Sequence, residues 1–189
     1  MTSFWIFFTV MAAFMQAWRN AFQKQLSLTV DVYGVTLARF IFGLPFAIVY
    51  IFILYLQQPL STHVEFTSRY WLYVIIAGMS QIAATALMVR LFKQKNYAIG
   101  VGLAKSEAIL AAMIAVAVLH EKLTVLGWFG VMLGGIAVFL LSNGKQKEAI
   151  SLQTLTIGIG SGLCFAITSL LVREASLELT NLPYLHRAA

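Results

Sequence analysis

The sequence predicts an all-α protein: a polytopic transmembrane helix bundle of about six helices. Hydrophobic residues make up 60% of the chain and charged residues only 11%, and the mean hydropathy is +0.85. A soluble domain of this length would carry far more charge. The formal charge of +6 comes mostly from Lys and Arg at the ends of apolar runs, so it indicates membrane orientation and predicts no nucleic-acid partner.

Six apolar runs approach the length of about 20 residues that a helix needs to cross a lipid bilayer. In chain order they are Phe4–Trp18, Val32–Leu56, Tyr70–Phe92, Tyr97–Leu119, Leu126–Leu141 and Leu152–Val172. Tryptophans lie near several of their ends, where amphipathic rings settle at the membrane–water interface. The first run lacks a basic leader, and Arg19 and Asn20 follow it in place of a small-residue cleavage site. We therefore expect a retained helix and not a signal peptide.

A polar stretch at 143–151 is the best candidate for an internal boundary. The part after it resembles the start of the chain: Gly158–Val172 is an apolar run that ends in Arg173, as the first run ends in Arg19. Arg187 then follows at a place close to that of Arg39. Weak internal symmetry of this kind is typical of transporters built from repeats, and it predicts that the second repeat is cut off inside its second helix.

Three features together resemble the first repeat of an EamA-type transporter of the drug/metabolite transporter superfamily. They are the helix-borne Arg39, the segment Leu119-His-Glu-Lys-Leu-Thr124, and the glycine-rich segment Gly127-Trp-Phe-Gly-Val-Met-Leu-Gly-Gly135. The resemblance implies ten helices in two five-helix repeats of inverted topology, and export or exchange of small metabolites, amino acids among them. It makes residues 1–142 the first repeat and 152–189 the start of a second, apparently truncated one.

The sequence leaves the membrane orientation of the helices open. One set of loops carries more positive charge than the other, which places the N-terminus outside the cytoplasm by the positive-inside rule, whereas the family resemblance implies a cytoplasmic N-terminus. The richer set is Lys24, Arg90, Lys93, Lys95, Lys145 and Lys147, against Arg69, Lys122 and Arg173.

Arg39, Lys105 and Glu107 lie inside apolar runs, where a charge costs about 3 kcal/mol on insertion scales. Such residues mark substrate or ion pathways by default. In that case Glu107 carries a coupling proton or meets a substrate ammonium, and Arg39 or Lys105 meets a carboxylate. Alternatively, Arg39 snorkels to the interface, or a buried Arg39–Glu107 ion pair only fixes the packing of two helices. Lys105 and Glu107 point apart on one helix, so each needs its own partner.

Uncharged polar groups extend this pathway. Gln16, Arg19, Asn20 and Gln23 follow the spacing i, i+3, i+4, i+7 and so form one stripe on the first helix. On the third helix, Gln81 shares a face with Thr85. For Gln16 and Gln81 both interhelical hydrogen bonding and cavity lining remain open.

Other motifs point to structure more than to chemistry. Gly130 and Gly134 form a small-x-x-x-small ridge that favours helix packing, with a dimer contact as the alternative. Glu121 or Thr124 is placed to satisfy the free N–H groups that begin the fifth helix, and the acidic charge of Glu121 suits the positive end of that helix. The three histidines have no ligand spacing, so no metal site is predicted. Nothing in the sequence indicates a cofactor.

We therefore expect an integral, multi-pass protein of the cell inner (plasma) membrane, not an enzyme, that transports a small polar or zwitterionic metabolite. Alternating access would proceed around a site lined by the first four helices, with Glu107 as the proton carrier. The chain would work as a homodimer or with a missing second half. The alternative is a truncated, non-transporting fragment or a membrane assembly partner.

Overall fold

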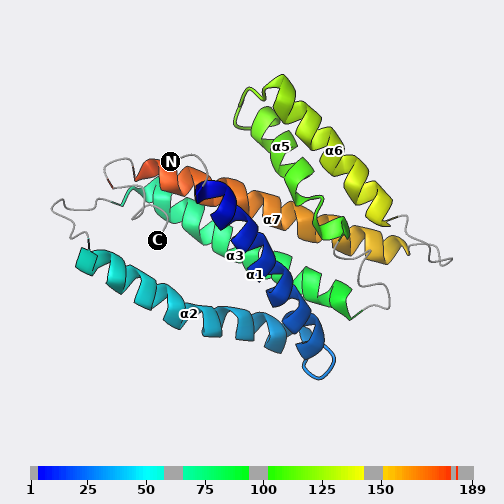
Figure 1. Cartoon of the computed structure of the whole chain (residues 1–189), viewed down its shortest axis with the longest axis horizontal. Coiled ribbons are helices and arrows are strands. Elements are labelled where there is room, and N and C mark those ends of the chain that lie inside the picture. The colour runs from blue at the N-terminus through cyan, green and yellow to red at the C-terminus, as the bar shows by residue number, and fades with distance from the viewer. Residues whose placement is uncertain (1–3, 58–65, 94–101, 143–150, 180–181, 183–189) are drawn as a thin grey trace.

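A computed structural model describes residues 4–57, 66–93, 102–142, 151–179 and 182. These residues form six α-helices and contain no strand, so the all-α prediction is confirmed. The helices, labelled as in Figure 1, are α1 (Phe4–Leu26), α2 (Val32–Gln57), α3 (Ser68–Phe92), α5 (Glu107–Ala117), α6 (Val125–Ser142) and α7 (Leu152–Glu178). Residues 143–150 of the polar stretch 143–151 lie outside the described residues, as does Arg187, so the predicted repeat stays a prediction.

Two helices extend further than their apolar runs. α1 continues to Leu26 and α7 to Glu178, since backbone hydrogen bonding carries each helix on into polar sequence. Side-chain caps fix two of the starts: Thr67 accepts a hydrogen bond from the Tyr70 N–H before α3, and Ser151 accepts one from the Thr154 N–H before α7.

The long helices suit a membrane. By length and hydropathy, α2, α3 and α7 can each cross a bilayer, and Val125–Leu140 forms a shorter apolar helix. Large apolar side chains cover the outside, among them Phe42 and Phe46 of α2, with 72% and 77% of their surface exposed. Exposed apolar surface of this extent is the face that lipid covers.

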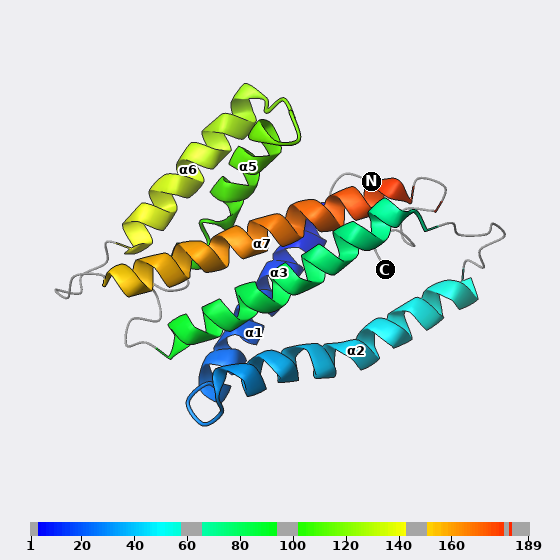
Figure 2. The same cartoon turned by 180° about the vertical axis from the view of Figure 1, so that it is seen from behind.

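An antiparallel pair of helices, α3 and α7, forms the centre of the fold (Figures 1 and 2). Hydroxyl groups join the two along their length. The fully buried Ser161 donates to the Ala84 carbonyl at 2.9 Å, and Thr168 donates to the Ala77 carbonyl at 3.3 Å. Hydroxyls that hydrogen-bond across helices stabilise packing where lipid supplies no hydrophobic drive.

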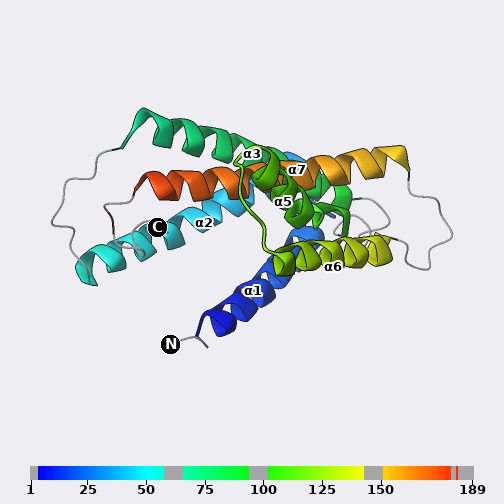
Figure 3. The same cartoon turned by 90° about the horizontal axis from the view of Figure 1, so that it is seen from above.

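The other helices lie on both sides of this pair. α2 packs on α3, and α5 packs on α7. α6 contacts α5 on the same side of the pair (Figures 1 and 2). α1 crosses the end of α3, where the Lys24 ammonium donates to the Phe92 carbonyl, and diverges from the central pair toward its N-terminus (Figure 3). Pro45 lies inside α2 and removes one hydrogen bond of its ladder.

The fourth predicted helix, 97–119, is wrong as a single continuous element. Gly102–Ala104 is helical, Lys105 and Ser106 form a turn, and α5 begins only at Glu107; residues 97–101 lie outside the described part. The turn closes through hydrogen bonds of the i→i−3 type, from the Lys105 and Ser106 N–H groups at 3.1 Å each. Lys105 therefore lies in a break and Glu107 directly follows it, so neither lies mid-helix.

Two glycines of α7 bring that break close. A Cβ placed on Gly158 would lie 2.6 Å from the Leu103 Cβ, and one on Gly162 would lie 2.6 Å from the Ser106 Oγ and 3.2 Å from the Glu107 nitrogen. Only glycine allows the two segments to approach this closely. The predicted ridge on α6 is different, because a Cβ on Gly130 or Gly134 meets no described atom within 4 Å. Its packing role stays a prediction.

Candidate functional site

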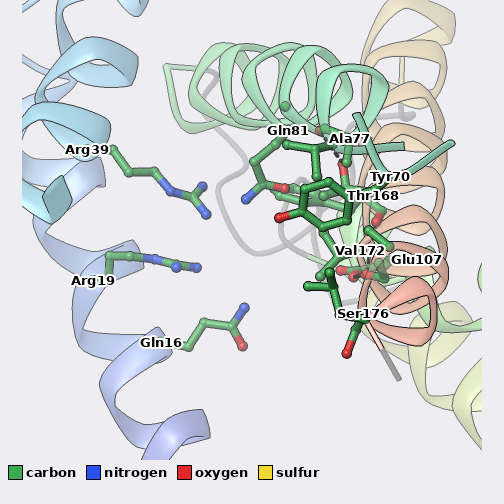
Figure 4. A pocket seen from close by; sticks show the side chains of 16 residues that line it. Gln16, Arg19, Arg39, Tyr70, Ala77, Gln81, Glu107, Thr168, Val172 and Ser176 are labelled. Carbon is green, nitrogen blue, oxygen red and sulfur yellow. Dashed lines mark hydrogen bonds between the residues drawn. The ribbon is translucent and has the colours of Figure 1, made fainter. Parts of the chain in front are cut away.

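A cavity of about 680 Å³ lies between α1 and α2 on one side and α3, α7 and the start of α5 on the other. Its size is within the range of small-molecule sites, roughly 300–1,000 Å³. Four of the five predicted pathway residues line it together: Gln16, Arg39, Gln81 and Glu107. They come from four different helices, and Figure 4 shows them facing one space.

Arg39 is held in place on the α2 side of the cavity. Its Nη1 donates to the Thr85 Oγ1 at 2.8 Å, and that hydroxyl donates onward to the Gln81 carbonyl at 2.9 Å. Thr85 is 1% exposed, so its position is fixed by packing. The guanidinium also lies 6.0 Å from the ring of Phe165, within cation–π range. Within the described part of the chain this one hydrogen bond leaves most of the five N–H donors of Arg39 for a ligand.

Arg19 of α1 is the second guanidinium of the cavity. It extends toward the same space as Arg39 (Figure 4), so two positive charges lie on one side of the cavity. Its Nε is buried without a hydrogen-bond partner in the described part of the chain. The sequence placed Arg19 in the polar stripe with Gln16 but did not identify it as a site residue, although the i, i+3 spacing was the signal.

Glu107 lies on the opposite wall from the two arginines (Figure 4). Its Oε1 is 2.9 Å from the Ser169 Oγ of α7. Among the described residues it forms no ion pair with Arg39, so the alternative of an Arg39–Glu107 packing pair is wrong. The cavity between the two residues keeps the opposite charges apart.

Lys105 is exposed and does not line the large cavity. It borders a neighbouring space of about 20 Å³ together with Gln16, Arg19 and Glu107. Its ammonium lies 3.5 Å from the Gln16 Oε1, at the outer limit of a hydrogen bond. Lys105 and Glu107 thus have separate partners, as the sequence predicted, although the helix that was to hold both is broken.

The sequence missed the contribution of α7. We expected a site lined by the first four helices, yet α7 supplies much of one wall. Its cavity-lining residues are Phe165, Thr168, Ser169, Val172, Ala175 and Ser176. They recur at spacings of three and four, which places them on one face of the helix. This spacing was visible in the sequence, but α7 was assigned to a separate repeat.

Other predicted positions have simple structural roles. Thr124 caps α6 by accepting from the Gly127 N–H at 3.2 Å, as expected. Glu121 does not cap; its carboxylate pairs with Arg173 of α7. Within the described ranges, no group of three His, Cys, Asp or Glu side chains could hold a metal ion.

A bundle of apolar helices around a charged cavity of solute size is the architecture of a membrane transport protein. Residues 3–143 match the EamA-like transporter family, and the chain belongs to that family. It is therefore an integral membrane protein of a transporter family, and the resemblance drawn from its motifs is confirmed. Curated proteins and solved structures give no match.

Proposed function

We propose that the chain carries a small polar or zwitterionic metabolite across the membrane by alternating access, with the cavity as its binding site. The observation that supports this most directly is the separation of charge across one space: Arg39 on α2 and Glu107 at the start of α5. A carboxylate of the solute would meet Arg39, and an ammonium would meet Glu107. Charged residues that face a cavity inside a membrane bundle mark substrate or ion pathways by default.

We further propose that Glu107 carries a coupling proton. Ser169 can serve both protonation states, because its Oγ lies 2.9 Å from the Glu107 Oε1 and 3.0 Å from the Phe165 carbonyl. A charged Glu107 accepts the hydroxyl hydrogen. A protonated Glu107 donates to the Ser169 Oγ, whose own hydrogen then turns to the Phe165 carbonyl. Proton uptake therefore needs no rearrangement of the helices.

The test is uptake and efflux of a labelled amino-acid and metabolite panel in vesicles that hold the chain. We expect transport that depends on pH, and Glu107→Gln should remove that dependence and most of the coupled transport, since a glutamine side chain cannot take up or release the proton. Glu174→Gln is the matched control, because Glu174 lies outside the cavity and contacts Arg173. A flat pH profile with Glu107→Gln fully active would exclude the proton-carrier role.

Assembly with another bundle is the second candidate function, favoured by the open glycine face of α6. A homodimer or a separate second half would cover Gly130 and Gly134, as close helix contacts do. Gly130→Leu should then weaken self-association measured in detergent. We place the protein in the cell inner (plasma) membrane, which fractionation of tagged cells would test.

A further inference from the structure

The charged residues that line the large cavity are two arginines and one glutamate. Arg19 and Arg39 lie on one side and Glu107 lies on the other (Figure 4). The described walls therefore carry one more positive than negative charge. Lys105 borders the adjoining space and adds to this excess.

The described surroundings do not neutralise the two guanidiniums. Arg39 bonds to a neutral hydroxyl, Thr85, and the Arg19 Nε is buried without an acceptor. Neither forms an ion pair with a described carboxylate. Two neighbouring positive charges inside an apolar bundle are costly unless an anion joins them.

From this arrangement we infer that the solute carries a net negative charge, and that Arg19 and Arg39 together bind its anionic groups. This inference rests on the proposed function and narrows its solute class. Guanidinium groups suit planar or tetrahedral oxyanions, because their N–H donors form paired hydrogen bonds to carboxylate or phosphate. Glu107 meets an ammonium on the same solute, so an amino acid with a second anionic group matches all three charges.

The expected solute class, amino acids with net negative charge, is tested with pairs of solutes that differ in charge but hardly in size. Binding of L-glutamate and L-glutamine, and of O-phospho-L-serine and L-serine, is measured on the purified chain in lipid nanodiscs. We expect the anionic member of at least one pair to bind about tenfold tighter or more, which is about 1.4 kcal/mol. The pair with the larger ratio shows whether a carboxylate or a phosphate is preferred.

Variants then assign the preference to Arg19. Arg19→Gln should reduce the charge preference to below about threefold. Arg19→Lys should keep more of it than Arg19→Gln does, since the positive charge remains although the paired hydrogen bonds are lost. Arg69→Gln is the matched control, because Arg69 is exposed at the start of α3 and outside the cavity. It should leave the ratio unchanged.

The inference fails if the neutral members bind as tightly as the anionic ones, if Arg19→Gln keeps the full preference, or if neither anionic probe binds. The comparison of anionic and neutral solutes on the wild-type chain needs no variant. It therefore tests the inference even if the Arg19→Gln variant does not fold. Flux of the bound solute is measured separately. Charge-selective binding without flux would refute transport alone, and flux of neutral solutes without preference would refute the charge class alone.

Discussion

Gly158→Ala tests the close contact between α7 and the helix break. A methyl group at this position would lie 2.6 Å from the Leu103 Cβ, whereas two carbon atoms pack best at about 3.5–4.0 Å. The Leu103 Cβ cannot rotate away, since it is bonded directly to the backbone. The two segments would therefore have to separate by about 1 Å.

The magnitude follows from two opposing terms. Overpacking a tight contact costs about 1–3 kcal/mol, while replacing glycine by alanine inside a helix returns about 1 kcal/mol. Gly160→Ala isolates the second term, because the nearest atom to its Cβ, Leu87 Cδ1, lies at an ordinary 3.6 Å. We expect Gly158→Ala to be less stable than Gly160→Ala by about 1–3 kcal/mol. For a chain of this length that is a Tm gap of roughly 2–12 °C.

The assay is thermal unfolding of both variants in detergent, followed by tryptophan fluorescence. Transport should follow the same order, because a shift of the break moves Glu107 at the cavity wall. Equal melting of Gly158→Ala and Gly160→Ala would refute the close approach of α7 to Leu103.

Two further changes probe the contacts around the cavity. Thr85→Val removes the acceptor of Arg39 and should raise KM about fivefold with little change in kcat, since one hydrogen bond is worth about 1 kcal/mol; unchanged KM in initial-rate measurements would contradict a positioning role. Glu121→Gln breaks a half-exposed ion pair with Arg173 and should cost at most about 1 kcal/mol of unfolding free energy. A larger loss on thermal unfolding would mean that this pair fixes the α5–α6 hairpin.

The helices themselves were predictable because lipid imposes a simple rule. A span must be long, apolar and internally hydrogen-bonded, so hydropathy alone locates it. The predicted second helix began at Val32, as α2 does, and the predicted third ended at Phe92, as α3 does. Hydropathy does not show where a helix continues into polar residues. The first apolar run therefore ends at Trp18, whereas α1 continues to Leu26.

Hydropathy could not predict the helix break at Lys105 and Ser106. No proline or glycine occupies the turn, and apart from Glu107 the helical residues on either side, 102–104 and 108–117, are as apolar as a spanning helix requires. What holds the break is contact with α7, where Gly158 and Gly162 allow backbone-level approach. Tertiary contacts of this kind leave no signal in the broken segment itself.

The break also explains how a glutamate, Glu107, is accommodated within an otherwise apolar segment. Glu107 is the first residue of α5, and the backbone N–H groups at a helix start carry partial positive charge that favours a carboxylate there. A continuous helix would have used those N–H groups in its own hydrogen bonds. Helices interrupted near a binding site are a recurrent device of transporters. In this chain the interruption favours the acidic charge of Glu107, which opposes Arg19 and Arg39 across the cavity.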